Sequence, residues 1–236
     1  MHFIAAVILE DMRDLTKTLA PFQKNNMGNV PKQYMQFVSV YKECEERYEK
    51  TSEKIKTKYP TLKEYIENCY RYKYDESQKD YGYWENPNAR WDYWLLCEKD
   101  SMARYQCEKM PDGYCKIKDF KKIMNCEELY NKAIRTWEIV VEGQPLKDGE
   151  EKPFWCEKEY YINSFKTKER FLIEMGTPYT YAFIYEGKWY EKGSIDWLAS
   201  NVSTEDIIYL YVEKFMQIIN DPKNQELYIA FVDCHI

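Results

Sequence analysis

The side chains best suited to acid–base or metal chemistry lie at the two ends of the chain. The chain has only two histidines, His2 and His235, and Asp233 stands two residues before the second. Because successive side chains of a strand point to opposite faces, Asp233 and His235 share one face of a C-terminal strand. Antiparallel pairing of the terminal strands brings His2 beside them. Two imidazoles and a carboxylate suit a metal site or a general acid–base site; the alternative is that both histidines lie at strand ends without a role.

A second group of candidates is an aromatic segment in the middle of the chain. Residues 81–94 contain six aromatic side chains, together with Arg90 and two asparagines. On a surface, such a segment is a stacking platform for bases or a hot spot for a protein partner; inside the protein, it is core. Because exposed tryptophans lower solubility, we expect the tryptophans as a group to be buried and the tyrosines to be better placed for contact. The residues expected to contact a partner are Tyr81, Tyr83, Trp84, Asn86, Asn88, Arg90 and Tyr93.

Sequence motifs of the common enzyme classes are missing. The sequence contains no nucleophile elbow, P-loop, dinucleotide fingerprint or kinase signature. It contains no Cys-x-x-Cys pair, so zinc-site spacings are absent too. We therefore expect no cofactor and no metal. The candidates for catalysis are His2, Asp92, Asp233 and His235.

Composition and charge restrict the class of protein. With 236 residues, 44% of them apolar and 17% aromatic, the chain can bury a core without disulfides or metals. A net charge of −6 argues against a broadly basic nucleic-acid binder and suits a basic partner surface. The apolar N-terminal run is far shorter than the about 20 residues of a membrane span, and it has no basic leader. We expect a cytoplasmic protein without a membrane segment, with its 8 cysteines reduced.

The order of the expected elements is that of an α+β protein. Strands are expected over 1–10, over 179–191 as a hairpin that turns at Glu186-Gly187, and over 227–236. Helices are expected over 30–58, 61–72, 119–141, 157–175 and 203–219. We expect an antiparallel, ferredoxin-like sheet that contains both terminal strands. The chain is expected to be a single α+β domain, 1–236, with a helical insertion at about 30–75 and an internal boundary at 143–153.

Five segments together resemble a family of phage and prophage proteins. The segments are His2-Phe3, 19–22 (Leu-Ala-Pro-Phe), 86–92 (Asn-Pro-Asn-Ala-Arg-Trp-Asp), 187–193 and 233–236 (Asp-Cys-His-Ile). Members of that family begin with a Ser-His-Phe strand, carry an Asn-Pro-x-x-Lys-Trp-Asp-Trp-Tyr segment and end in Asp-(Cys/Tyr)-His-Ile. The resemblance implies a phage or prophage context, in which an anti-defence (anti-CRISPR-like) role is expected. It implies no particular reaction.

The chain departs from the family pattern where an anion site would be expected. Family members follow the central segment with Gly-Gly-Arg-Trp, a turn that could bring backbone N–H groups and a guanidinium to an anion. This chain has Cys97-Glu98-Lys99-Asp100 at that place, and Gln23-Lys24 where relatives are acidic. The chain thus keeps the segments that it shares with the family but lacks the expected anion site. This favours a fold that has been reused for binding.

Two functions of different classes stay open. The first, which we favour, is an intracellular binding protein that inhibits a host defence component, for example a CRISPR effector, by protein–protein contact. Its partner would be a host protein or ribonucleoprotein complex. The alternative is a protein that binds or processes nucleotides or nucleic acid through a His/Asp site at the paired terminal strands. The sequence does not indicate the oligomeric state.

Overall fold

Two compact units make up the chain. The computed structural model describes residues 2–97, 110, 112–153, 157–178, 180–195, 201–202 and 205–236. Unit 1 comprises Met1–Thr18 and Trp94–Ile236, and unit 2 comprises Leu19–Tyr93. The segment 98–100, in which the chain departs from the phage family, lies outside the described residues. That the chain is a single domain, 1–236, stays a prediction.

Unit 1 is built on one six-stranded sheet. Five strands follow the order β5-β11-β1-β7-β8, and β6 pairs with β11 as well. The bounds are β1 (His2–Leu9), β5 (Tyr93–Leu96), β6 (Tyr114–Lys116), β7 (Ala182–Tyr185), β8 (Lys188–Glu191) and β11 (Tyr228–His235). The two central strands are mostly apolar, and residues on both of their faces are buried from Ala5 to Leu9 and from Ile229 to Cys234.

Pairing within this sheet confirms the α+β class. β1 pairs antiparallel with β11 along its whole length, from His2 opposite His235 to Leu9 opposite Tyr228, as the sequence predicts. The ferredoxin-like arrangement is not confirmed, because β1 pairs directly with β7 and in parallel, which makes the sheet mixed. The predicted hairpin is confirmed: β7 and β8 are joined by Glu186 and Gly187, both at positive φ, as a tight two-residue turn requires.

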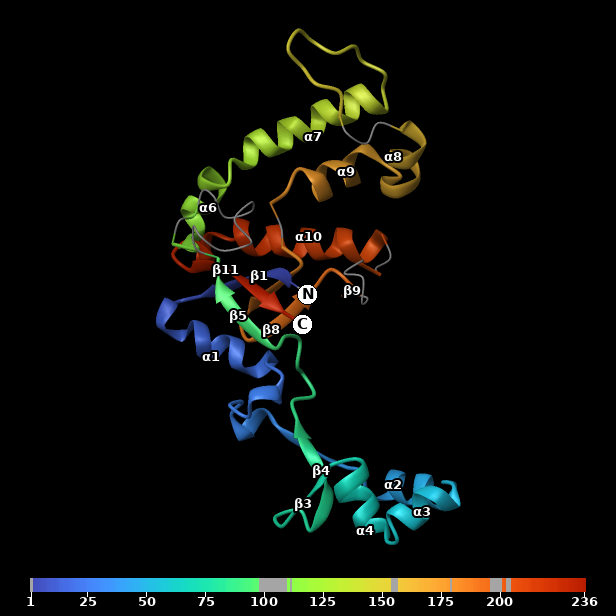
Figure 1. Cartoon of the computed structure of the whole chain (residues 1–236). Coiled ribbons are helices and arrows are strands. Elements are labelled where there is room, and N and C mark those ends of the chain that lie inside the picture. Colours follow the sequence, from blue (N-terminus) through green and yellow to red (C-terminus); the bar gives the residue numbers. More distant parts are fainter. Residues whose placement is uncertain are drawn as a thin grey trace. The chain divides into compact units, whose positions relative to one another are not determined.

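Helices cover the sheet in successive layers on one face (Figure 1). The bounds are α6 (Ile117–Ile123), α7 (Cys126–Val140), α8 (Lys158–Phe165), α9 (Lys168–Met175) and α10 (Glu205–Asn220). α6 and α10 pack on the sheet: the Phe120 ring lies 6.0 Å from that of Phe231, and the Phe215 ring lies 5.5 Å from that of Phe183. α9 contacts α10, and α7 contacts α9, so α7 forms the outermost layer. A second cluster of Ala133, Trp137 and Phe171 joins these outer helices.

Short elements complete the description of unit 1. β9 (Ser194–Ile195) and β10 (Asn201–Val202) form a two-stranded ribbon. The helix α1 (Leu15–Leu19) crosses the boundary between the units. Turns of 3-10 helix lie at Met12–Asp14 and Pro222–Asn224. Among the described residues, no helix is both long enough and apolar enough to cross a membrane.

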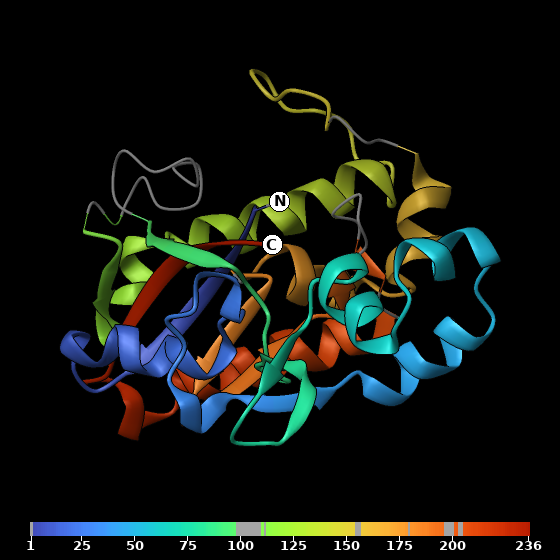
Figure 2. The ribbon, with the colours of Figure 1, turned by 60° about the horizontal axis from the view of Figure 1, so that its bottom comes forward.

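Unit 2 combines a small sheet with short helices (Figure 2). Its sheet has the order β2-β4-β3. The bounds are β2 (Gln36–Ser39), α2 (Tyr41–Glu49), α3 (Glu53–Lys58), α4 (Leu62–Glu64), a π-helical turn (Tyr65–Cys69), β3 (Lys73–Asp75) and β4 (Asp80–Glu85), after 3-10 turns at Ala20–Phe22, Asn25–Met27 and Lys32–Tyr34. The core of the unit comprises Val40, Cys44, Ile66 and Tyr81.

One predicted helix of unit 2 is wrong in its first part. The spacing of apolar residues predicts a helix over 30–58, but Gln36–Ser39 form the strand β2, which pairs antiparallel with β4. The apolar pair Phe37 and Val38 fits either pattern, so the local sequence does not decide between them. Pairing with β4 decides it, since it satisfies the backbone of both strands.

Candidate functional site

The pairing of β1 with β11 assembles the predicted terminal site. His2 lies directly opposite His235, and their ring centroids are 4.9 Å apart at an interplanar angle of 70°. Asp233, two residues before His235, is the diagonal neighbour of His2 on the same face. The His2 Nδ1 lies 3.0 Å from the Asp233 Oδ1, which is hydrogen-bond distance. We call these three residues the terminal-strand site.

Burial separates the roles of Asp233 and His2. The Asp233 side chain is 5% exposed, whereas that of His2 is 38% exposed. Asp233 shares its strand face with Phe231, which packs against α6, so the carboxylate lies at the end of the core. A buried carboxylate is expensive unless a donor compensates it, and His2 provides that donor. The arrangement is a buried carboxylate that orients a half-exposed imidazole.

The other chemistry-bearing residues do not extend this site. Cys234 points to the opposite face and is fully buried, and burial raises the pKa of its thiol. Within the ranges that the structure describes, no group of three His, Cys, Asp or Glu side chains is arranged to hold a metal ion. Asp92 belongs to unit 2, where its carboxylate lies 3.1 Å from the Lys24 ammonium. The structure therefore groups three of the four catalytic candidates.

Three exposed aromatic residues lie on the hairpin of β3 and β4: Tyr83 and Trp84 belong to the segment 81–94, and Tyr74 lies before it. Tyr74, Tyr83 and Trp84 are 43%, 40% and 37% exposed, and we call these three residues the aromatic hairpin. Tyr93, at the end of the unit, is exposed as well. Trp91 is buried, as expected for the tryptophans, whereas Trp84 is not. The sequence segment thus divides into core and surface residues.

Two contacts fix the orientation of Trp84. Its indole Nε1 donates a hydrogen bond to the Asp75 Oδ2 at 2.7 Å, and the Phe37 ring lies edge-on to it at 5.6 Å. Hydrogen bonds, first from the Ser77 hydroxyl and then from Trp84, lower the pKa of Asp75 to about 2. The carboxylate beside the exposed indole is therefore charged throughout the physiological range. Phe37 and Asp75 were not singled out from the sequence, although the alternation of residues along β2 and β3 places them on this face.

Tyr83 is held by stacking on the opposite face. Its ring stacks on that of Tyr72 at 5.8 Å, and Tyr72 stacks in turn on Tyr70 at 6.1 Å. The Tyr70 hydroxyl accepts a hydrogen bond from the Arg47 guanidinium at 3.2 Å. This row of rings leaves Tyr83 at the surface with little rotational freedom.

Two of the predicted contact residues are structural instead. Tyr81 is 9% exposed, and its hydroxyl donates to the Glu67 Oε1 at 2.8 Å. Asn86 is 4% exposed, and its amide donates to the carbonyl oxygens of Pro21 and Gln23 at 2.8 and 3.0 Å. Neither side chain is presented to a partner. Asn88 and Arg90, by contrast, are exposed.

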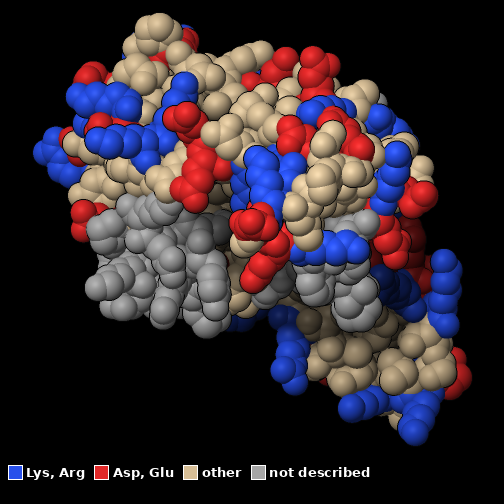
Figure 3. Space-filling view, turned by 90° about the horizontal axis from the view of Figure 1, so that it is seen from above, with Lys and Arg blue, Asp and Glu red and all other residues tan. Residues whose placement is uncertain are grey.

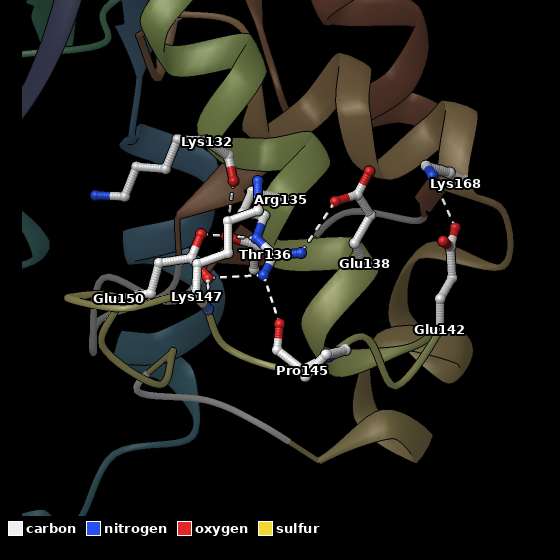
Figure 4. A network of polar contacts seen from close by, with 9 residues as sticks. All are labelled: Lys132, Arg135, Thr136, Glu138, Glu142, Pro145, Lys147, Glu150 and Lys168. Carbon is white, nitrogen blue, oxygen red and sulfur yellow. Dashed lines mark hydrogen bonds and ion pairs between the residues drawn. The ribbon is translucent and has the colours of Figure 1, made fainter.

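A polar network on α7, which the sequence did not indicate as a unit, ties down the segment 143–153 (Figure 4). The Arg135 guanidinium donates to both carboxylate oxygens of Glu150 at 2.7 Å and to the Pro145 carbonyl at 2.7 Å. Arg135, and then the Lys147 backbone N–H, lower the pKa of Glu150 to about 2. The predicted internal boundary is thus a loop clamped onto a helix. Its role is structural, since the guanidinium is already engaged.

No family model matches the chain, and no curated protein or solved structure was found to be similar to it.

Proposed function

We propose that the chain is a phage-encoded protein that binds a host protein and thereby inhibits a host defence component. The observation that carries the proposal is the aromatic hairpin: three large aromatic side chains lie exposed on a unit of 75 residues. Tyr and Trp dominate the energetics of protein–protein hot spots. The family resemblance supplies the expected class of partner, a defence complex of the host.

Preorganisation supports a binding role for the aromatic hairpin. Trp84 is fixed by Asp75 and Phe37, and Tyr83 by Tyr72. A side chain that is already immobile loses little conformational entropy on binding, which otherwise costs about 0.5–1.5 kcal/mol per side chain. Trp84 and Tyr83, which lie on opposite faces of the hairpin, are therefore each ready to bind without rearrangement.

The net charge of the chain, −6, favours a basic partner. Unit 1 carries 21 Lys and Arg against 28 Asp and Glu, whereas unit 2 carries 13 against 12. The excess acidity therefore belongs to unit 1, although over α7–α9 the two signs are interspersed (Figure 3). A net negative charge increases the rate of encounter with a basic, nucleic-acid-handling complex. The negatively charged Asp75 beside Trp84 is a further group that could contact a basic side chain of the partner.

The test is quantitative binding with matched variants of the full chain. The tagged protein is incubated with host lysate, the captured protein is identified and purified, and its affinity is measured by calorimetry. We expect Trp84→Ser and Tyr83→Ser each to weaken binding at least about tenfold, since truncating a hot-spot residue costs about 2 kcal/mol or more. Tyr160→Ser is the control, because Tyr160 is 52% exposed, more than Tyr83 or Trp84, but lies on α8 of unit 1.

Two results would contradict the proposal. One is a lysate from which the full chain captures no stoichiometric partner. The other is a purified partner that Trp84→Ser, Tyr83→Ser and Tyr160→Ser bind with the same affinity as the original protein.

A further inference from the structure

The end of β11 breaks the apolar pattern of the central strands. Ile229 to Val232 are buried and apolar, and the next residue is the buried Asp233. An apolar residue at this position would pack without the cost of desolvating a carboxylate. The contact that accounts for a carboxylate here is the one with His2 Nδ1, 3.0 Å from Oδ1. Asp233 thus replaces an apolar core residue at the position of β11 from which a side chain can orient the His2 imidazole.

Contact with Asp233 sets the tautomer of His2. A carboxylate accepts hydrogen bonds, so the Nδ1 of His2 carries the proton and donates it to Asp233. The lone pair of the neutral imidazole is then on Nε2. A carboxylate on one ring nitrogen fixes the tautomer and the orientation of the ring, so the other nitrogen is the one that can accept a proton. His2 is therefore oriented as a general base.

A second imidazole lies beside the first. The His235 ring is 4.9 Å from that of His2, centroid to centroid, and almost perpendicular to it. The two rings come from opposite ends of the sequence and are held together by the full-length pairing of β1 with β11. One ligand can therefore contact both imidazoles, and Asp233 orients that of His2. Two imidazoles at this spacing suit a base and an acid that act on the same substrate.

We propose that the terminal-strand site cleaves phosphodiesters by general acid–base catalysis, with His2 as the base and His235 as the acid. Displacement at phosphorus needs a proton removed from the attacking oxygen and a proton delivered to the leaving oxygen, at two separate positions. A pair of imidazoles supplies both, whereas acyl transfer needs only one imidazole that acts twice. This activity goes beyond protein binding and uses only unit 1.

The step balances without a further reactant. His2 Nε2 takes the proton of the attacking hydroxyl, which belongs to water or to the neighbouring sugar. Its oxygen forms a bond to phosphorus as the bond from phosphorus to the leaving oxygen breaks. The His235 imidazolium gives its proton to that leaving oxygen. Asp233 does not touch the substrate; it is a positioning residue that holds the His2 tautomer.

The experiment uses the full chain and two oligonucleotides of the same sequence, one RNA and one DNA. Cleavage of RNA alone indicates attack by the sugar 2′-hydroxyl, and cleavage of both indicates attack by water; either result supports the proposal. We expect His2→Gln and His235→Gln each to reduce the rate at least about 100-fold, the usual contribution of a general acid or base. Asp11→Asn is the matched control, because Asp11 is a carboxylate of unit 1 outside the terminal-strand site.

A second readout does not depend on activity. Nitrogen NMR of the imidazoles distinguishes the two tautomers, and we expect His2 in the original protein to be protonated on Nδ1. Asp233→Asn should change that tautomer balance and the pH dependence of the rate, which a merely structural role of Asp233 would leave unchanged. The proposal is overturned if neither oligonucleotide is cleaved, if His2→Gln cleaves at the original rate, or if His2 is protonated on Nε2.

Discussion

Units 1 and 2 build their interiors from different side chains. The sheet of unit 1 is filled by aliphatic residues and phenylalanines, such as Ile229 and Phe231. Unit 2 contains 11 of the 23 tyrosines of the chain in 75 of its 236 residues, and Tyr65 and Tyr81 belong to its interior. A buried tyrosine needs a hydrogen-bond partner, whereas an aliphatic side chain needs only space. Unit 2 therefore depends on polar contacts inside its core, whereas unit 1 adds such contacts, as from the Tyr211 hydroxyl to the Thr180 carbonyl, to a core that is mostly apolar.

This difference also explains how each candidate site is positioned. The terminal-strand site depends on register: two strands of eight residues pair along their whole length, and a slip by one residue would turn Asp233 to the opposite face. The aromatic hairpin depends on local contacts, such as the bond from the Trp84 indole to Asp75. A site set by register resists local change, and a site set by single contacts is sensitive to it.

The largest effect is expected from a core truncation in unit 1. Phe231→Ala removes a ring that is 2% exposed and contacts Phe120, so we expect the free energy of unfolding to fall by about 3–5 kcal/mol. Denaturant titration measures the loss, and hydrogen exchange resolved along the chain shows where it occurs. We expect the amides of β1 and β11 to lose most of their protection. Equal loss of protection in β4 of unit 2 would contradict the view that the units have separate cores, since it would mean that they unfold as one cooperative unit.

A smaller effect is expected from the polar interior of unit 2. Asn86→Ala removes the donor to the carbonyl oxygens of Pro21 and Gln23 and leaves both without it, which costs about 1–3 kcal/mol. Asn88→Ala is the matched control: Asn88 is exposed, so its substitution should change stability by less than about 0.5 kcal/mol. Thermal unfolding of both variants is the measurement. Equal effects of the two substitutions would show that the amide of Asn86 does not hold the unit together.

Comparison of particular residues shows what the sequence could predict. The terminal pairing follows from two apolar segments with one histidine each, and the hairpin follows from Glu186-Gly187; both are local patterns that a sheet can satisfy. The helices expected over 119–141 and 157–175 are each broken, at Asn125 (φ 49°) and at Lys166 (φ 62°). Neither break has a glycine or proline to announce it. Each break lets the two helices that it separates pack in different directions. Such packing depends on tertiary contacts, which the local sequence does not show.

The candidate site shows the same limit. His2, Asp233 and His235 could be grouped from the sequence because strand alternation and antiparallel pairing are regular. The burial of Asn86 could not, since it depends on two carbonyl oxygens that lie more than 60 residues earlier in the chain. Contacts between irregular segments have no periodicity, so no pattern in the residues 81–94 separates Asn86 from the exposed Asn88.

The smallest effect, and the sharpest comparison of the units, concerns two carboxylates whose pKa values are both lowered to about 2. Glu150 of unit 1 owes its low pKa mainly to the Arg135 cation, and Asp75 of unit 2 owes it mainly to the neutral Ser77 hydroxyl and Trp84 indole. Salt screens a partly exposed ion pair more than a hydrogen bond from a neutral donor. Raising the sodium chloride concentration to about 1 M should therefore raise the pKa of Glu150 and leave that of Asp75 nearly unchanged, as carboxyl carbon NMR can measure.

Acid should also release the loop that Glu150 holds. The folded pKa of Glu150 lies below its ordinary value of 4.5, so its stabilisation is present above pH 4.5 and is lost as the pH falls toward 2. Glu150→Gln removes the charge at every pH and should make the segment 143–153 sensitive to proteolysis at pH 7. Glu151→Gln is the control, since it changes the neighbouring exposed carboxylate alone. Equal cleavage of the two variants would show that Arg135 does not clamp this loop, and the contrast between an ionic tie in unit 1 and neutral ties in unit 2 would fail.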